Sequence, residues 1–168
     1  STVLEALDFL SRCASEGLQA AAAAHGGVQS ILTIGAKGPI VFEMSWGFVK
    51  KSENNKAHTL HWGVSLQPET SGVVTVVREE LIDAASTPPQ HLITTNDRGV
   101  RSVLAEKANK VKPSTAKSTT KLTFEELVDP DRFHSLTSLN VLLTSINVIG
   151  AISTSPTWAR ADQSAGSP

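Results

Sequence analysis

The residues whose type and spacing could do chemistry are concentrated in one short basic segment. Between residues 98 and 121 there are seven cationic residues and one acid, Glu106, so this segment carries +6 in a chain whose net charge is −1. The seven are Arg98, Arg101, Lys107, Lys110, Lys112, Lys117 and Lys121. Each Lys or Arg in such a row can displace a counterion from a nucleic-acid phosphate. Lys50, Lys51 and Lys56, at the tip of a predicted hairpin, would enlarge the basic surface if the fold brings them near.

Three interpretations of this basic segment remain open. It could bind RNA or single-stranded DNA, it could meet an acidic surface on another protein, or it could be a solvated face with no specific partner. The rest of the chain carries −7, so oppositely charged regions are available for association or docking. No aromatic residue lies among the basic ones, and stacking of bases is therefore not predicted.

Histidine and cysteine give no sign of a metal or redox site. His58 and His61 lie three apart in a predicted strand, which sends their side chains to opposite faces and prevents them from chelating one metal. Cys13 is the single cysteine of the chain, which excludes an internal disulfide and a cysteine-rich zinc site. It stands within a predicted helix, where we expect it to act as a small packing residue. We therefore expect no metal and no cofactor.

The sequence also lacks the motifs of nucleophilic catalysis. It has no Gly-x-Ser-x-Gly elbow, and the stretch from Gly35 to Gly38 precedes a predicted strand and lacks the spacing of a phosphate-binding loop. The adjacent acids Glu79 and Glu80 point to opposite sides of a strand, and a helix start explains the acids at 125 and 126. We expect no catalytic residue and no enzyme activity.

The elements predicted most clearly are two strands, at Ile40 to Lys51 and at His58 to Gln67. Large apolar residues alternate with other residues along both, which points them to one face of a sheet. The opposite face carries Glu43, Ser45 and His61 and should be wet; an enzyme acting on a small molecule, the remaining alternative, would use these three residues. A one-residue slip would expose the whole apolar set, so the register is well specified.

Further strands are predicted at about 28–34 and 73–82, with a fifth at 91–95, and short turn-rich connections join them into an antiparallel meander. Residues 2–24 are predicted to form a helix that stops at a pair of glycines. The apolar sheet face must be covered, and the helices are the only cover that this chain has. We therefore expect the helices to lie on that face.

A basic helix is predicted over residues 98–111, with Asp97 as its N-cap and Pro113 at its end. Residues 112–120 have no hydrophobic period and are predicted to be a linker or exposed loop.

The start of the next helix is predicted from a capping box of Thr123 and Glu126, with Leu122 and Leu127 as a hydrophobic staple. Asp129 as N-cap, followed by proline, then begins a helix that runs to about residue 150. A strand over 139–149 is the competing prediction for that stretch.

The predicted class is α+β, with an N-terminal helix, a four- to five-stranded antiparallel β-meander, and C-terminal helices packed on the apolar sheet face. The length of 168 residues fits one domain, assigned to residues 1–152, which can bury roughly 70% of its unfolded surface. Residues 153–168 form a polar tail that we expect to be ordered by contact with a partner, with Trp158 as its anchor. No apolar run reaches the ~18 residues that a membrane span needs.

These features favour a non-catalytic structural or interaction subunit of a larger assembly, which could be organellar or viral. Its partners would be other protein subunits, in a homo- or hetero-oligomer. The alternative is a protein that binds RNA or single-stranded DNA through the 98–121 segment and the sheet face. The single cysteine and the lack of a secretory signal predict an intracellular location, in the cytoplasm or in an organelle such as a mitochondrion after removal of a transit peptide.

Overall fold

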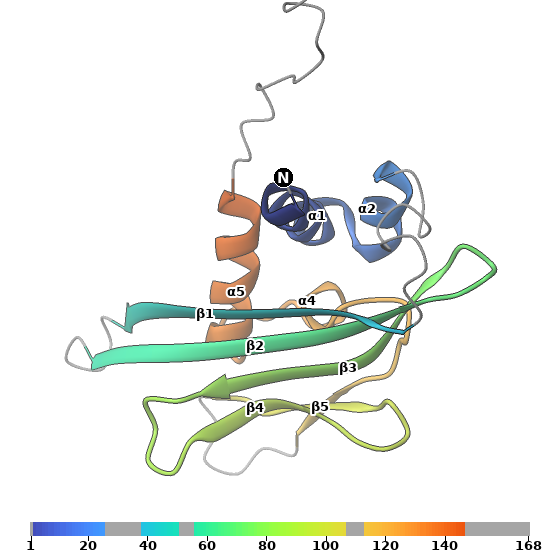
Figure 1. Cartoon of the computed structure of the whole chain (residues 1–168). Coiled ribbons are helices and arrows are strands. Elements are labelled where there is room, and N and C mark those ends of the chain that lie inside the picture. The colour runs from blue at the N-terminus through green and yellow to red at the C-terminus, as the bar shows by residue number, and fades with distance from the viewer. Residues whose placement is uncertain (1, 26–37, 51–55, 107–112, 147–168) are drawn as a thin grey trace, which may run out of the picture.

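The structure is a computed structural model of the 168-residue chain, and it describes residues 2–25, 38–50, 56–106 and 113–146. These residues form helices and one antiparallel sheet, an α+β architecture (Figure 1). The helices are α1 (Thr2–Glu16), α2 (Leu18–Ala24), α4 (Thr123–Glu126) and α5 (His134–Ser145). The strands are β1 (Ile40–Lys50), β2 (Lys56–Pro68), β3 (Val74–Asp83), β4 (Gln90–Thr95), β5 (Arg101–Val103) and β6 (Ser114–Ala116).

The sheet is a meander in which each strand pairs with the next in the chain, in the order β1-β2-β3-β4-β5-β6. β1 and β2 pair without interruption from Ile40↔Leu66 to Lys50↔Lys56. The strands predicted at 40–51, 58–67, 73–82 and 91–95 are confirmed. The strand predicted at 28–34 lies outside the described residues.

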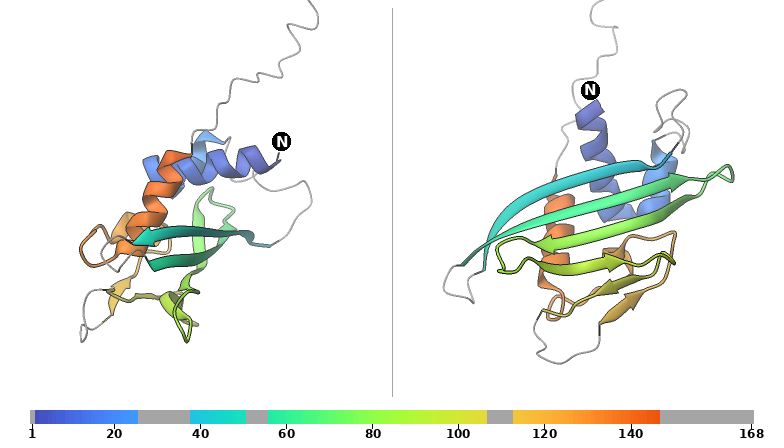
Figure 2. Two further views of the ribbon diagram at one scale, coloured as in Figure 1. Left: turned by 90° about the vertical axis from the view of Figure 1, so that its left-hand side faces the viewer. Right: turned by 60° about the horizontal axis from the view of Figure 1, so that its bottom comes forward.

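The helices cover one face of the sheet, as the apolar alternation predicts (Figure 1, Figure 2). The inward side chains of β2 are buried, and Trp62 at the centre of the strand is 1% exposed. They share one core with side chains of α1 and α5, among them Phe9, Leu10, Cys13, Leu136, Leu139 and Leu143. Burying a large apolar side chain stabilises the fold by roughly 1.5–3 kcal/mol, so this contact between sheet and helices dominates the stability.

A bulge in β3 decides which of its acids face the core. The register changes from Ser65↔Arg78 to Leu66↔Val76, which leaves Val77 as an extra residue. Val77 and Arg78 are both exposed, and after them the alternation resumes with the opposite parity. Because of this bulge, Glu79 faces inward and Glu80 outward.

The helix predicted over 2–24 is two helices, because the chain breaks at Gly17. Gly17 has φ 91°, a conformation that side-chain-bearing residues rarely adopt. The break redirects the chain, so that α2 lies beside the start of β3, where the Gln19 amide donates to the Val74 carbonyl at 2.8 Å. The alanine run of α2 buries Ala21 and Ala22 in the core.

The basic helix predicted over 98–111 is wrong for residues 98–106. Residues 96–99 form a hairpin turn closed by Gly99, whose φ is 72°. The side chain of Asn96 accepts hydrogen bonds from the backbone N–H groups of Arg98 and Val100, so Asn96 organises a turn where a helix N-cap at Asp97 was predicted. The chain then enters β5, and the predicted linker contains β6, which pairs with β5.

After residue 120, the helices begin near the predicted positions, but different residues serve as N-cap and as the acid of the capping box. The Leu122 N–H donates to Glu125 Oε1 at 2.6 Å, so the reciprocal acid is Glu125 and the N-cap residue is Leu122. Asp129 accepts from the backbone N–H groups of residues 131 and 132, but this caps a turn, and α5 begins only at His134. The competing strand is excluded for residues 139–145, which are helical.

Candidate functional site

The predicted basic surface is present only in part among the described residues. Arg98, Lys117 and Lys121 are exposed, as that prediction requires. Arg101 does not belong to the surface, because it is 1% exposed. Lys50 and Lys56 are paired at the end of the β1–β2 hairpin. Their side chains, and the residues Lys51, Lys107, Lys110, Lys112 and Trp158, lie outside what the structure describes, so their role stays a prediction.

Arg101 forms a buried ion pair with Glu79. Its Nη1 lies 2.7 Å from Glu79 Oε2, and the two side chains are 1% and 0% exposed. The same carboxylate accepts hydrogen bonds from the Thr123 backbone N–H at 3.0 Å, the Thr123 hydroxyl at 2.7 Å and the Trp62 indole N–H at 3.2 Å. The buried carboxylate is thus contacted by one cation and by three further hydrogen-bond donors.

The rest of the Arg101 guanidinium is equally well bonded. It donates to the carbonyl of Lys121 at 2.8 Å, to the carbonyl of Ser118, and to Glu126 Oε2 at 3.0 Å. Glu126 in turn accepts from the backbone N–H of Ser118. These bonds fasten the segment before α4 to the inner face of the sheet. With its polar atoms satisfied by the protein itself, the cluster has a structural role and leaves no group to act on a ligand.

Burial shifts the pKa of two further titratable groups near α4. Burial raises the pKa of the Glu125 carboxyl above its ordinary value, although donation from the backbone N–H groups of Leu122 and Leu18 opposes this. Burial, with a smaller contribution from the charge of Glu125, raises the pKa of the Cys13 thiol far above its ordinary value. Cys13 therefore stays protonated and poorly reactive, and the prediction that it is a packing residue is confirmed.

The outer, polar face of the sheet carries a serine and a histidine in contact. Ser45 and His61 are paired across β1 and β2, and Ser45 Oγ lies 2.5 Å from His61 Nδ1. They line a shallow hollow of about 210 Å³ together with Glu43 and Glu80. A hydrolytic serine needs a histidine oriented by a third group. Within the described residues, His61 makes its one hydrogen bond to Ser45, and no three His, Cys, Asp or Glu side chains gather as a metal site.

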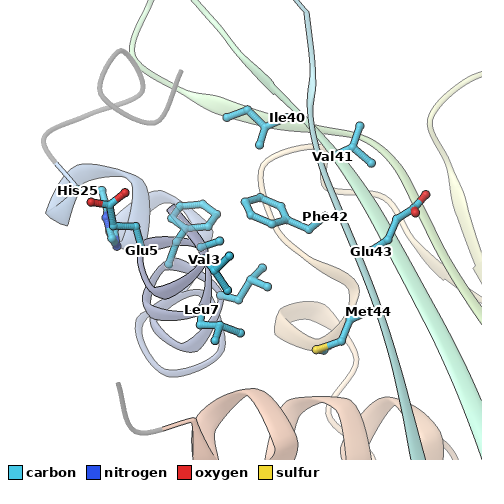
Figure 3. Close-up of a pocket in the computed structure, with 12 residues that line it drawn as sticks. Val3, Glu5, Leu7, His25, Ile40, Val41, Phe42, Glu43 and Met44 are labelled. Atoms are coloured by element: carbon cyan, nitrogen blue, oxygen red, sulfur yellow. The ribbon is translucent and has the colours of Figure 1, made fainter. Parts of the chain in front are cut away.

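A larger hollow lies between α1 and β1 (Figure 3). We call it the α1–β1 groove; it encloses about 700 Å³. Its walls are mainly apolar, with Val3, Ala6, Leu7, Phe9 and Leu10 from α1 and Ile40, Phe42 and Met44 from β1. The groove exists because β1 is the outermost strand among the described residues. Phe42, Met44 and Trp46 of β1 are only half-buried, whereas the inward residues of β2 are fully covered.

The floor of the groove is ordered by aromatic contacts. The rings of Phe9 and Phe42 stack with their centroids 5.6 Å apart, and the His25 ring meets Phe9 edge-on at 5.7 Å. His25 Nε2 also lies 3.1 Å from Asp8 Oδ2. These contacts join α1, the end of α2 and β1, so the groove is a preformed feature of the fold.

The groove continues around the edge of β1 that faces away from β2. Val41 and Glu43 also line it, although both point away from α1 (Figure 3). Its rim holds large apolar side chains in contact with water, with Val3 68% and Val41 58% exposed. Among the described residues that line it, Glu5 and Glu43 are the acids, and none is Lys or Arg.

The α1–β1 groove was not predicted, because the helices were expected to cover the whole apolar face. α1 crosses the sheet with its first turn projecting, so Val3 and Leu4 are left exposed. Val41 lies on the outer face of the strand, but single apolar residues are common on protein surfaces, so it gave no specific signal for the groove.

Comparison with protein-family models, with curated proteins and with solved structures finds no match. Among the described residues, no helix has the length and apolar character needed to cross a membrane.

Proposed function

We propose that this protein is a non-catalytic interaction subunit of a larger assembly, and that a partner protein docks in the α1–β1 groove. The observation that carries the proposal is an apolar groove of about 700 Å³ open along the edge strand of the sheet. Monomeric proteins seldom leave a contiguous apolar surface of this kind in water, and such surfaces are typical of interaction sites.

The shape of the groove favours a protein over a small molecule. Small-molecule sites enclose 70–90% of the ligand surface, whereas this groove runs out past β1 onto the opposite face of the sheet. The exposed valines at its rim, Val3 and Val41, would stay wet beside a small ligand. A partner that covers both the groove and the rim removes all of this apolar surface from water, which is the main driving force of association.

The proposal is tested by photo-cross-linking in the native cells. A photoreactive amino acid replaces Val41 at the rim of the groove in one variant and Val128, which is 80% exposed outside the groove, in the other. We expect a discrete cross-linked partner from position 41 and none from position 128. Adding Ala6→Trp, which fills the groove, should remove the cross-link, while Val128→Trp should leave it.

A chain that sediments as a monomer in fresh lysate and gives no cross-link from position 41 would contradict the proposal. Circular dichroism and thermal unfolding of the Ala6→Trp variant establish that the loss of the cross-link comes from the filled groove and not from loss of the fold.

A further inference from the structure

We infer that the α1–β1 groove takes an extended segment of the partner, which adds to the sheet as a strand beside β1 and in which apolar residues alternate with basic ones. This inference rests on the proposed function and specifies the chemistry of the partner. Three features of β1 carry it: its free edge, its inner face and its outer face.

The edge of β1 is an open template for strand pairing. Among the described residues, β1 pairs only with β2, so its other side presents unpaired backbone N–H and C=O groups. The strand is 11 residues long, and its pairing with β2 is regular, without a bulge. Proteins commonly protect such an edge with charged side chains, Pro or a bulge. β1 carries Glu43 and, as its last residue, Lys50, and the stretch from Ile40 to Gly47 contains no Lys, Pro or bulge.

The inner face of β1 selects apolar residues at every second position of the added strand. Phe42 and Met44 are two residues apart and point toward α1 (Figure 3). Side chains of an adjacent strand that point the same way would enter the groove between these residues and Leu7. Only an extended segment matches this spacing, because a helix presents its apolar residues at intervals of three and four.

The outer face of β1 selects a basic residue at the alternate positions. Glu43 is exposed and points away from α1. Its neighbour across the sheet is Gly63, and beyond Gly63 lies Glu80, so two carboxylates flank a position without a side chain. Glu80 is paired with Arg78 at 2.5 Å, whereas Glu43 forms no ion pair within the described residues. A Lys or Arg on an added strand would pair with Glu43 directly or diagonally.

A second copy of this chain fits the edge poorly. The outward residues of its own β1 would be Val41, Glu43, Ser45 and Gly47, which include an acid and no base. Self-pairing would therefore bring a second Glu43 to an edge that is already acidic, without a cation to compensate it.

The test uses three synthetic fluorescent peptides of about nine residues, enough to span the groove as a strand. In the first, valine alternates with lysine and threonine; in the second, glutamate replaces the lysines. The third has the composition of the first with its valines at helical spacing. Fluorescence anisotropy with the full chain should show the first binding at least about tenfold more tightly than the other two.

Charge reversal at the edge supplies the matched comparison. Glu43→Lys should abolish the preference for the lysine peptide over the glutamate peptide. Asp97→Lys makes the same change of charge at the exposed β4–β5 turn and should leave the preference unchanged. Hydrogen exchange locates the contact: alternate amides of β1 should exchange freely in the chain alone and slow when the lysine peptide is added.

Equal binding of the three peptides, or β1 amides that are all protected in the chain alone, would overturn the inference. The second result would mean that the edge is already paired. If the partner still cross-links from position 41 and Ala6→Trp removes that cross-link, the proposed function stands while strand addition is wrong. If the cross-link is absent too, both are wrong.

Discussion

Arg101 and Arg98 show that the position of an arginine in the fold decides whether its charge stabilises the core or contacts water. In the sequence it belongs to a row of seven cations, and in the fold it is the buried partner of Glu79, bonded on both sides. A charge in that position is stable only while its partners remain, because a single unpaired ion in the core is costly. Its neighbour Arg98 has the same chemistry and stays in water.

We therefore expect Arg101→Met to lower the free energy of unfolding by roughly 3–5 kcal/mol, since it leaves Glu79 buried without its cation. Arg98→Met is the control and should change the free energy by no more than about 0.5 kcal/mol. Urea unfolding followed by circular dichroism measures both. Similar values for the two variants would show that the buried pair does not hold the sheet to the segment before α4.

The carboxyl of Glu125 makes stability depend on pH. Its folded pKa is raised by burial, so the charged form is less favourable in the folded state than in the unfolded one. The cost is absent at low pH and appears as pH rises through the ordinary carboxyl range. Both backbone donors, Leu122 and Leu18, bind Oε1, an atom that glutamine keeps.

Glu125→Gln should therefore be more favourable relative to the native protein at pH 7 than at pH 4. Thermal unfolding at the two pH values measures the difference, with the exposed Glu5→Gln correcting for general loss of an acid. The raised pKa of Glu125 would be contradicted if the gain in thermal stability from Glu125→Gln were equal at the two pH values or larger at pH 4.

At the scale of elements, a bulge in β3 and a break between α1 and α2 set the orientation of these elements. The extra residue Val77 changes the parity of β3 and so puts Glu79 in the core opposite Arg101. The positive φ of Gly17 separates α1 from α2 and lets α2 approach β3. These two features therefore place Glu79 in the core and α2 beside β3.

Gly17→Ala should lower the free energy of unfolding by about 1–2 kcal/mol or more, because the backbone is left-handed there. The added Cβ would also lie 2.9 Å from Glu125 Oε2. Gly63→Ala, where a Cβ meets nothing within 4 Å, is the control and should be neutral or stabilising. Chemical unfolding distinguishes them; equal effects would mean that the helix break is not required.

The strands were predictable because alternation is a local property, and long runs such as 40–50 specify both the element and its face. The strand β5 was not predicted, because Val100, Val103 and Leu104 also fit a helical period. What makes that stretch a strand is the turn closed by Gly99 and the pairing of Arg101 with Glu79, 22 residues away. No local pattern reports a partner at that distance.

At the scale of the whole molecule, the helices cover one face of the sheet unevenly. β2 and β3 lie beneath the helices with their inward side chains buried, and β1 at the edge keeps a half-covered apolar face. The α1–β1 groove follows from that arrangement. The candidate site could not be predicted from the sequence, because it depends on where α1 lies across the sheet and not on any motif.

The central claim is that this edge is where a partner binds, and it is tested most directly by hydrogen exchange of the full chain, free and in the complex purified with it from its native cells. We predict slower exchange in the complex over residues 2–10 and 40–47. Protection confined to residues 98–106 and 113–121, with β1 unchanged, would contradict the account and place the contact on the basic segment instead.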